Sequence, residues 1–238
     1  ITRLPVYARM AEEQIAYLNA HLFDAATGAF YGCEDFLGKE SGELSSDEEF
    51  FSILDECIYI DANTQTIVAY LDAAETLAEP RCRERALHAL EFLWERCRTP
   101  NGAMTHYYHG AAHVAGLLED QVYMGIALLK AHSITRDTRY LDRATALAEF
   151  ILVRLKNPQG GYYDIDVPGP ALSAFRLTLI AQNGRAASFF LTLAQAAQNS
   201  RYRDAALWAL AAFNGDFSSY GLDAAFFGQA LGEYAEGL

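Results

Sequence analysis

Residues 117–164 read LLEDQVYMGIALLKAHSITRDTRYLDRATALAEFILVRLKNPQGGYYD. From about Glu119 to Ile134 the side chains are apolar on most of a helix circumference, which indicates a helix that is buried on all sides. A polar hinge follows, in which Thr138 is the expected helix cap. The next helix, about Arg139 to Leu155, is amphipathic, with a 4-3-4-4 spacing of apolar residues on one face: Tyr140, Ala144, Leu147, Ile151 and Leu155. The stretch therefore predicts an inner helix, an outer helix that shields it, and a glycine turn that returns the chain.

This hairpin repeats along the chain, and such repeats decide the architecture. When the sequence is shifted by 58 residues, the segment 70–104 falls on 128–162, so that Ala86 matches Ala144 and Pro100 matches Pro158. A shift of 62 residues in the other direction places Tyr202 on Tyr140. We expect inner helices to start near Asn63, Asp120 and Asn183. In this register three carboxamides become equivalent, each near the start of a buried helix: Asn63, Gln121 and Asn183.

The rest of the chain supplies further helices and their connectors. We expect a first helix over 6–22, with its buried side marked by Val6, Met10, Ile15, Leu18 and Leu22. A short acidic helix is expected over 47–57, an inner and outer pair over 63–98, another pair over 184–213, and a final helix over 223–234. Strands should be short and confined to the connectors 104–114 and 162–180.

Alternating buried and amphipathic helices with a period of about 60 residues predict an all-α fold, an α/α toroid of helical hairpins. A solenoid of the same hairpins is the competing architecture, but its repeats usually have ~34–47 residues. The helices number about eight or nine, fewer than a ring of six hairpins requires, so an incomplete ring is expected. The repeat register favours one domain over residues 1–238. Since the first residue is Ile, we expect a fragment of a longer chain.

Composition excludes several classes of partner. The net charge of −13 argues against nucleic acid, whose binding needs clustered Lys and Arg, and against an anionic membrane surface. No apolar run reaches the ~20 residues of a membrane span, and no signal peptide is visible. The four cysteines form no CxxC pair, which predicts free thiols in a cytoplasmic protein. Cys33, in a loop flanked by glycine, would be the first choice for a nucleophile, but a small buried apolar role suits free cysteine better.

Six segments in order resemble a known family: FYGCEDF (30–36), DEEFFSIL (47–54), IYIDANTQTIVAYLDAA (58–74), the helical hairpin over 117–150, GGYYD (160–164) and the segment 182–210. Together they resemble the helical region of the thioredoxin-domain-containing family DUF255 (the YyaL type), over nearly the whole chain. The chain departs from the family pattern at Cys33-Glu34-Asp35-Phe36, at Ala62 and at Gln121, where the family has more aromatic or acidic residues.

The resemblance implies an (α/α)6 barrel of the six-hairpin glycosidase type, similar to the N-acylglucosamine 2-epimerases. Family members usually carry a thioredoxin-like domain before this region, which makes such a domain an expected partner in a longer protein. The 2-epimerases use a pair of histidines at the ends of inner helices. Here the inner helices start with Asn, Asp and Gln, so epimerisation by that mechanism is not supported.

Carboxylates at the mouth of the ring are candidates for catalysis. Glycoside hydrolysis needs two carboxyl groups flanking the scissile bond, one of them with a raised pKa. Asp120 is the first choice, with Asp61 or Asp35 as its partner. The competing interpretation is that these residues are ordinary helix caps and first-turn charges.

Amides and aromatic rings near the same mouth suit sugar hydroxyls and pyranose faces. The expected substrate-binding residues are Asn63, Gln121, Asn183, Tyr31, Tyr123, Tyr162 and His106. His106, His109 and His113 have a spacing that could serve zinc on a helix, but the glycine and alanines among them favour a loop, so no metal is expected.

No dinucleotide fingerprint, P-loop or nucleophile elbow occurs, so no cofactor is expected. Two functions remain. One is binding or processing of a small-molecule sugar in a central pocket of acidic and carboxamide groups. The alternative is a non-catalytic helical module that accompanies a thioredoxin-like domain.

Overall fold

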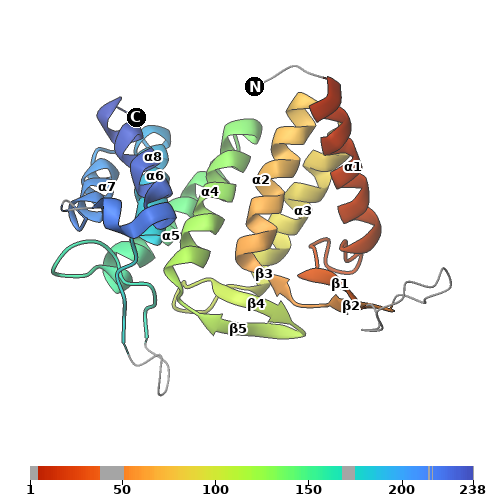
Figure 1. The fold of residues 1–238 in the computed structure, drawn as a ribbon, viewed down its shortest axis with the longest axis horizontal. Coiled ribbons are helices and arrows are strands. Elements are labelled where there is room, and N and C mark those ends of the chain that lie inside the picture. Colours follow the sequence, from red (N-terminus) through yellow and green to blue (C-terminus); the bar gives the residue numbers. More distant parts are fainter. Residues whose placement is uncertain (1–4, 38–50, 168–174, 214, 216, 238) are drawn as a thin grey trace.

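The computed structural model describes residues 5–37, 51–167, 175–213, 215 and 217–237 (Figure 1). Within these ranges there are eight α-helices: α1 (Pro5–His21), α2 (Ile60–Thr76), α3 (Pro80–Arg96), α4 (Leu118–Thr135), α5 (Thr138–Phe150), α6 (Ile180–Ala196), α7 (Arg201–Ala211) and α8 (Ala225–Ala235). A π-helical turn, Ile151–Leu155, extends α5, and a 3-10 segment, Phe217–Ala224, precedes α8. None of the helices in the described ranges is both long and apolar enough to cross a membrane.

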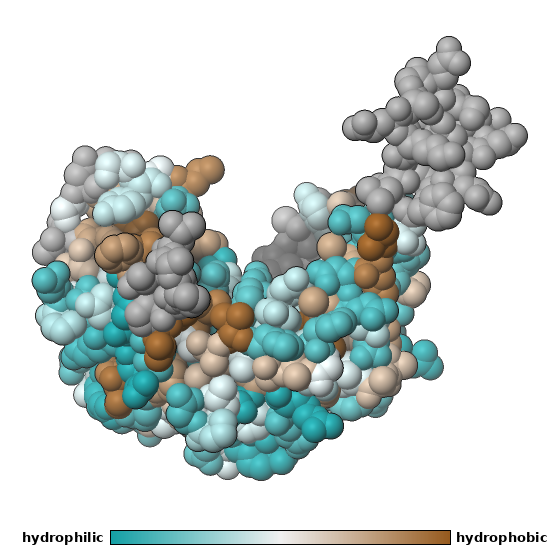
Figure 2. Space-filling model, turned by 90° about the horizontal axis from the view of Figure 1, so that it is seen from below, coloured by the Kyte–Doolittle hydropathy of each residue, from teal (hydrophilic) through white to brown (hydrophobic). Residues whose placement is uncertain are grey.

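The helices form an incomplete toroid of hairpins. The pairs α2/α3, α4/α5 and α6/α7 each place one inner helix against one outer helix, and α2, α4, α6 and α8 follow one another side by side. Seen from below, the molecule is a crescent that is hollowed along one side (Figure 2). An open hollow is lined by residues of the inner helices α2, α4 and α6.

The central hairpin confirms the sequence pattern. α4 buries residues all round its circumference, and the five apolar residues of the 4-3-4-4 face on the next helix are all buried. The hinge differs in one respect, because the N-cap of α5 is Asp137, whose side chain accepts a hydrogen bond from the Arg139 N–H at 2.9 Å. Thr138, the expected cap, is the first residue of the helix. Arg136 adopts a left-handed φ of 62° and ends α4.

The strands lie at one end of the helices. β3 (Ile58–Tyr59), β4 (Thr105–His109) and β5 (Ala111–Ala115) form an antiparallel sheet in that order, which confirms a short hairpin in the connector after α3. A second hairpin, β1 (Cys33–Leu37) with β2 (Phe51–Asp55), was not expected. The helix predicted over 47–57 is therefore wrong for residues 51–55, because pairing with β1 overrides local propensity; residues 47–50 lie outside the described ranges.

The first helix buries less than its pattern indicates. Ile15, Leu18 and Leu22 pack against the core, whereas Val6 and Met10 are 46% and 52% exposed. The C-terminal half of α1 is attached to the first hairpin through Asn19, which accepts hydrogen bonds from Tyr70 and Arg85. The expectation that Val6 and Met10 are buried is thus corrected, since the N-terminal half of α1 lacks such contacts.

Candidate active site

The inner helices α2, α4 and α6 begin at the same end of the molecule, beside the three-stranded sheet (Figure 1). Their first turns carry Asp61 on α2, Glu119 and Asp120 on α4, and Gln182 on α6. The sheet adds His106 from β4, which follows the outer helix of the first hairpin. Helix starts expose free N–H groups and the positive end of the helix dipole, so this end of the ring favours oxygen-rich ligands.

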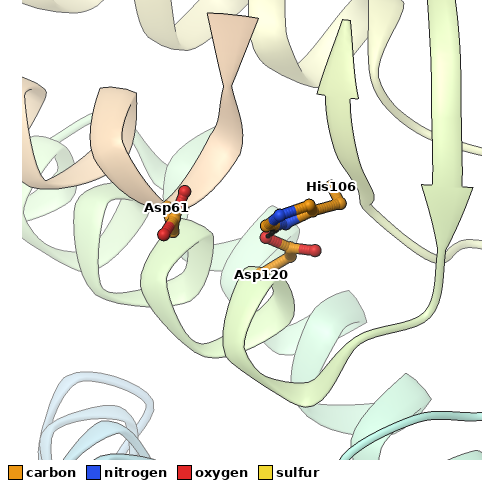
Figure 3. A group of neighbouring side chains, drawn as sticks. All are labelled: Asp61, His106 and Asp120. Atoms are coloured by element: carbon orange, nitrogen blue, oxygen red, sulfur yellow. Dashed lines mark hydrogen bonds and ion pairs between the residues drawn. The ribbon is translucent and has the colours of Figure 1, made fainter. Parts of the chain in front are cut away.

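His106 and Asp120 form the centre of the site. The Nδ1 of His106 lies 3.1 Å from an Oδ1 of Asp120, whose side chain is fully buried. Asp61, one helix away, completes a group in which one ligand atom from each residue lies within 4.8 Å of the others (Figure 3). Two carboxylates and one imidazole therefore converge from α2, α4 and β4.

Burial changes the acid–base properties of this pair. Desolvation raises the pKa of Asp120 to about 6, although the hydrogen bond and the charge of His106 act in the opposite direction. The same hydrogen bond to Asp120 raises the pKa of His106 above its ordinary 6.5, against the effect of burial. Because the two groups are coupled, each observed pKa is a property of the pair and not of one residue. Such a pair can take up or release a proton near neutral pH, where general acid–base catalysis is most effective.

Two polar atoms at this end of the ring have no partner. Among the described residues, Asp120 Oδ2 and Gln182 Oε1 are buried side-chain atoms without a hydrogen bond. The amide nitrogen of Gln182 is 3.5 Å from Glu119, at the limit of a hydrogen bond. Buried polar atoms are almost always paired, so two orphaned acceptors at adjacent helix starts indicate a place for a hydrogen-bond donor from a ligand.

The three equivalent carboxamides have a different role from the one expected. Each is at most 1% exposed and binds the backbone of the glycine turn that precedes its helix. The side-chain oxygen accepts from the N–H, and the nitrogen donates to the carbonyl, of one turn residue: Phe30 for Asn63, Met104 for Gln121 and Tyr162 for Asn183. The nitrogen also donates to the carbonyl four residues earlier in each case.

These amides therefore hold the turns to the inner helices. The expectation that Asn63, Gln121 and Asn183 converge on a pocket and contact a ligand needs correction, because their hydrogen-bonding groups are occupied by backbone. The equivalence of the three positions in the repeat is nevertheless correct. It reflects a shared structural hydrogen-bond pattern.

Other predicted residues divide between the site and the rest of the molecule. Tyr123 lies one turn beyond Asp120 on α4 and lines the hollow. Tyr162 is buried in the core, where its hydroxyl donates to the Ala205 carbonyl. Tyr31 is not one of the Asp61, His106 and Asp120 group; burial and, to a smaller extent, the charge of Asp24 raise its pKa. Asp35 is exposed on the β1–β2 hairpin, so the structure does not bring it to Asp120.

The histidines of the connector do not form a metal site together. His113 stacks on Tyr107 with ring centroids 4.9 Å apart, and His109 is exposed at the tip of the hairpin. Only His106 of the three joins Asp120. In the described part of the chain, Asp61, His106 and Asp120 are the residues that could receive a divalent cation. His106 Nδ1 and Asp120 Oδ1 are also within hydrogen-bond distance, as an acid–base pair requires.

Arg185 on α6 is a residue of the site region that the sequence pattern did not reveal. It lines the hollow beside Tyr123. The available signal was that Arg185 is the single charged residue of α6.

Comparisons with known proteins agree with this architecture. A scan of protein-family models finds no match, and a search of curated proteins finds none. Among solved structures, an unsaturated glucuronyl hydrolase specific for heparin is 15% identical, with a TM-score of 0.73, over 99% of this chain and 70% of that one. Cellobiose 2-epimerase from Bacillus thermoamylovorans is 13% identical, with a TM-score of 0.72, over 99% of this chain and 69% of that one.

A glycoside hydrolase family 76 mannosidase from Bacteroides thetaiotaomicron is 13% identical, with a TM-score of 0.71, over 98% of this chain and 64% of that one. Two further family 76 structures are matched over only 43% and 35% of their lengths. The chain thus spans less than two thirds of these three proteins. The likenesses confirm the predicted fold class, an α/α toroid of the six-hairpin glycosidase type, which these carbohydrate-processing enzymes share.

Proposed function

We propose that this chain carries the acid–base site of a carbohydrate-processing enzyme, with Asp120 as the proton donor to a glycosidic oxygen. The observation that supports this most directly is the state of Asp120. Its side chain is fully buried, one of its oxygens has no partner, and burial raises its pKa to about 6. A carboxylic acid with a raised pKa is what the acid step of glycoside hydrolysis requires.

Asp61 supplies the second carboxylate. Its oxygen lies within 4.8 Å of the ligand atoms of Asp120 and His106. Carboxyl groups about 5–5.5 Å apart are typical of enzymes in which the second carboxylate attacks the sugar, whereas ~6.5–9.5 Å leaves room for a water molecule. The separation of Asp61 and Asp120 is closer to the shorter range, in which the second carboxylate attacks the sugar. In this scheme the glycosidic C–O bond breaks, the leaving oxygen takes the proton of Asp120, and Asp61 attacks the anomeric carbon; water later hydrolyses that bond and returns the proton to Asp120.

His106 acts as a positioning residue for Asp120. Its Nδ1 bonds one carboxyl oxygen, whereas the other, Oδ2, is buried without a partner. The surrounding fold supports the same function, since the structural neighbours named above process carbohydrates.

The test is hydrolysis of a panel of aryl glycosides, combined with calorimetric binding of the parent sugars. We expect Asp120→Asn to abolish turnover while keeping sugar binding within about threefold, because the amide keeps the shape and loses the proton. Asp142→Asn, the same change on the exposed face of α5, should leave turnover unchanged. Absence of both hydrolysis and millimolar binding by the wild type would favour the non-catalytic module. Full turnover by Asp120→Asn would contradict the assigned role.

A further inference from the structure

Arg185 lies on the inner side of the ring, one helical turn beyond Gln182 on α6. It helps to line an open hollow of about 320 Å³, whose other lining residues include Thr64, Gln65 and Asp72 of α2 and Tyr123 of α4. Tyr123 is itself one turn beyond Asp120. One turn corresponds to about 5.4 Å along a helix. Arg185 and Tyr123 therefore lie about one turn further along their helices than Gln182 and Asp120.

Two aromatic rings hold the guanidinium of Arg185. Its Cζ lies 3.4 Å from the ring centroid of Phe226 on α8 and 4.6 Å from that of Tyr123. Gly184 makes this possible, because a Cβ at that position would lie 2.4 Å from the Phe227 backbone nitrogen. α8 can therefore approach α6 closely enough for Phe226 to cover the arginine. Stacking fixes the plane of the guanidinium and leaves its N–H edge for another group.

Arg185 has no counter-ion among the described residues. In the ranges that the structure describes, it makes no hydrogen bond and no ion pair, and its contacts are the two rings. The acidic residue that lines the hollow, Asp72, is paired with Lys130. This contrasts with arginines on the outer helices, such as Arg143, which pairs with Glu91.

The acidic composition of the chain makes an arginine without a carboxylate partner unusual. With 31 acidic residues against 18 basic ones, carboxylates are abundant, yet none of those in the described ranges is placed on Arg185. A planar guanidinium fixed by stacking presents a fork of N–H donors that matches a carboxylate or a phosphate. The counter-charge of Arg185 is then expected to come from a ligand.

We propose that Arg185 recognises a negatively charged substituent, a carboxylate or a phosphate ester, on the saccharide that reaches Asp120. The substrate class is therefore an acidic sugar. The inference rests on the proposed function, because it assumes that a saccharide occupies this part of the ring. Arg185 is a specificity-determining residue in this scheme, and Asp120 carries the chemistry.

The test compares four probes by calorimetry: D-glucuronate, D-glucose 6-phosphate, D-glucose and inorganic phosphate. We expect at least one acidic sugar to bind the wild type about tenfold more tightly than glucose, since charge-assisted hydrogen bonds are roughly twice as strong as neutral ones. Whichever acidic sugar is preferred identifies the substituent. Arg185→Gln should reduce this preference to about threefold or less, and Arg185→Lys should retain part of it because the charge remains. Arg139→Gln, the same change at an exposed arginine, should leave the preference intact.

The outcomes separate this inference from the proposed function. Equal affinity for glucose and both acidic sugars would overturn the role of Arg185 and leave saccharide binding standing. If Arg185→Gln still prefers the acidic sugar to glucose, the role of Arg185 is overturned as well. The same holds if inorganic phosphate binds as tightly as glucose 6-phosphate. If no saccharide binds at tens of millimolar, the proposed function fails and the inference with it. Should Arg185→Gln lose its cooperative thermal transition, Arg185→Lys carries the comparison.

Discussion

Asn183 binds both backbone groups of Tyr162. Its Oδ1 accepts from the Tyr162 N–H at 2.7 Å, and its Nδ2 donates to the Tyr162 carbonyl at 3.0 Å. The second hydrogen of Nδ2 is used by the Leu179 carbonyl. One side chain thus joins the start of α6 to the glycine turn that follows the preceding hairpin, as its equivalents do at α2 and α4.

Removing this amide should destabilise the fold. Asn183→Ala leaves the N–H and the carbonyl of Tyr162 buried without partners, at a cost of about 1–3 kcal/mol for each group. We expect the free energy of unfolding in urea to fall by roughly 3–5 kcal/mol. Gln195→Ala, at an exposed carboxamide of the same helix, should change it by no more than about 0.5 kcal/mol. Equal effects of the two changes would show that the amide does not hold the turn.

The contact between α6 and α8 should be sensitive to one methyl group. Gly184→Ala would place a Cβ 2.4 Å from the Phe227 nitrogen, a backbone atom that cannot move alone. Overpacking of this kind costs about 1–3 kcal/mol. Gly228→Ala on α8 meets nothing within 4 Å and should stabilise the helix by about 0.5–1 kcal/mol. Thermal denaturation of both variants checks the opposite signs, and a neutral Gly184→Ala would contradict the packing.

The imidazole of His106 should titrate above its ordinary pKa. The hydrogen bond to Asp120 is the largest cause of the raised pKa, and burial opposes it. Asp120→Asn removes the carboxylate and keeps the burial, so the pKa of His106 should fall. NMR titration of the histidine ring resonances measures both values, with exposed His109 as the internal control. An unchanged His106 pKa in the variant would show that the two side chains are not paired in solution.

The same pair should make stability depend on pH. The folded-state pKa of Asp120, about 6, is above its ordinary 3.8. Between these two values the folded chain keeps a proton on Asp120 that the unfolded chain has released. The stability that this proton contributes is fully present below pH 3.8 and is lost as the pH rises through 6. Its size is roughly 3 kcal/mol, at 1.36 kcal/mol per pKa unit.

The measurement is urea denaturation of wild type and Asp120→Asn between pH 4 and pH 7. The wild type should lose stability relative to the variant as the pH rises, since the raised pKa of His106 acts in the same direction. Other titrating groups cancel in the difference. A difference that is constant with pH, or that grows in favour of the wild type, would contradict the raised pKa of Asp120.

The thiols should react in order of exposure. All four cysteines are free, with Cys33 exposed on β1 and Cys82 and Cys97 buried. Burial raises the pKa of Cys97 to about 12. With a disulfide reagent, the native protein should react first at Cys33, and Cys82 and Cys97 should react only on unfolding. Four thiols per chain are expected in denaturant without reductant; a lower number would indicate a disulfide.

The periodicity of residues 117–164 was sufficient to predict the central hairpin, because helix burial depends on which local side chains are apolar. The repeat register likewise predicted the toroid and the equivalence of Asn63, Gln121 and Asn183. Both are one-dimensional patterns that a helical period makes visible. The β1–β2 hairpin was not predictable in this way, since Phe51–Asp55 becomes a strand only when Cys33–Leu37 lies beside it.

The sequence by itself determined the all-α ring and the end of the ring where polar residues gather. Only the tertiary structure decided what those residues do. Asn183 and Asp120 both stand in the first turn of an inner helix, yet backbone groups from another segment saturate the first, whereas burial leaves an oxygen of the second without a partner. Hydrogen-bond partners, desolvation and the approach of Phe226 to Arg185 depend on distances between segments that are far apart along the chain, and no local pattern encodes those distances.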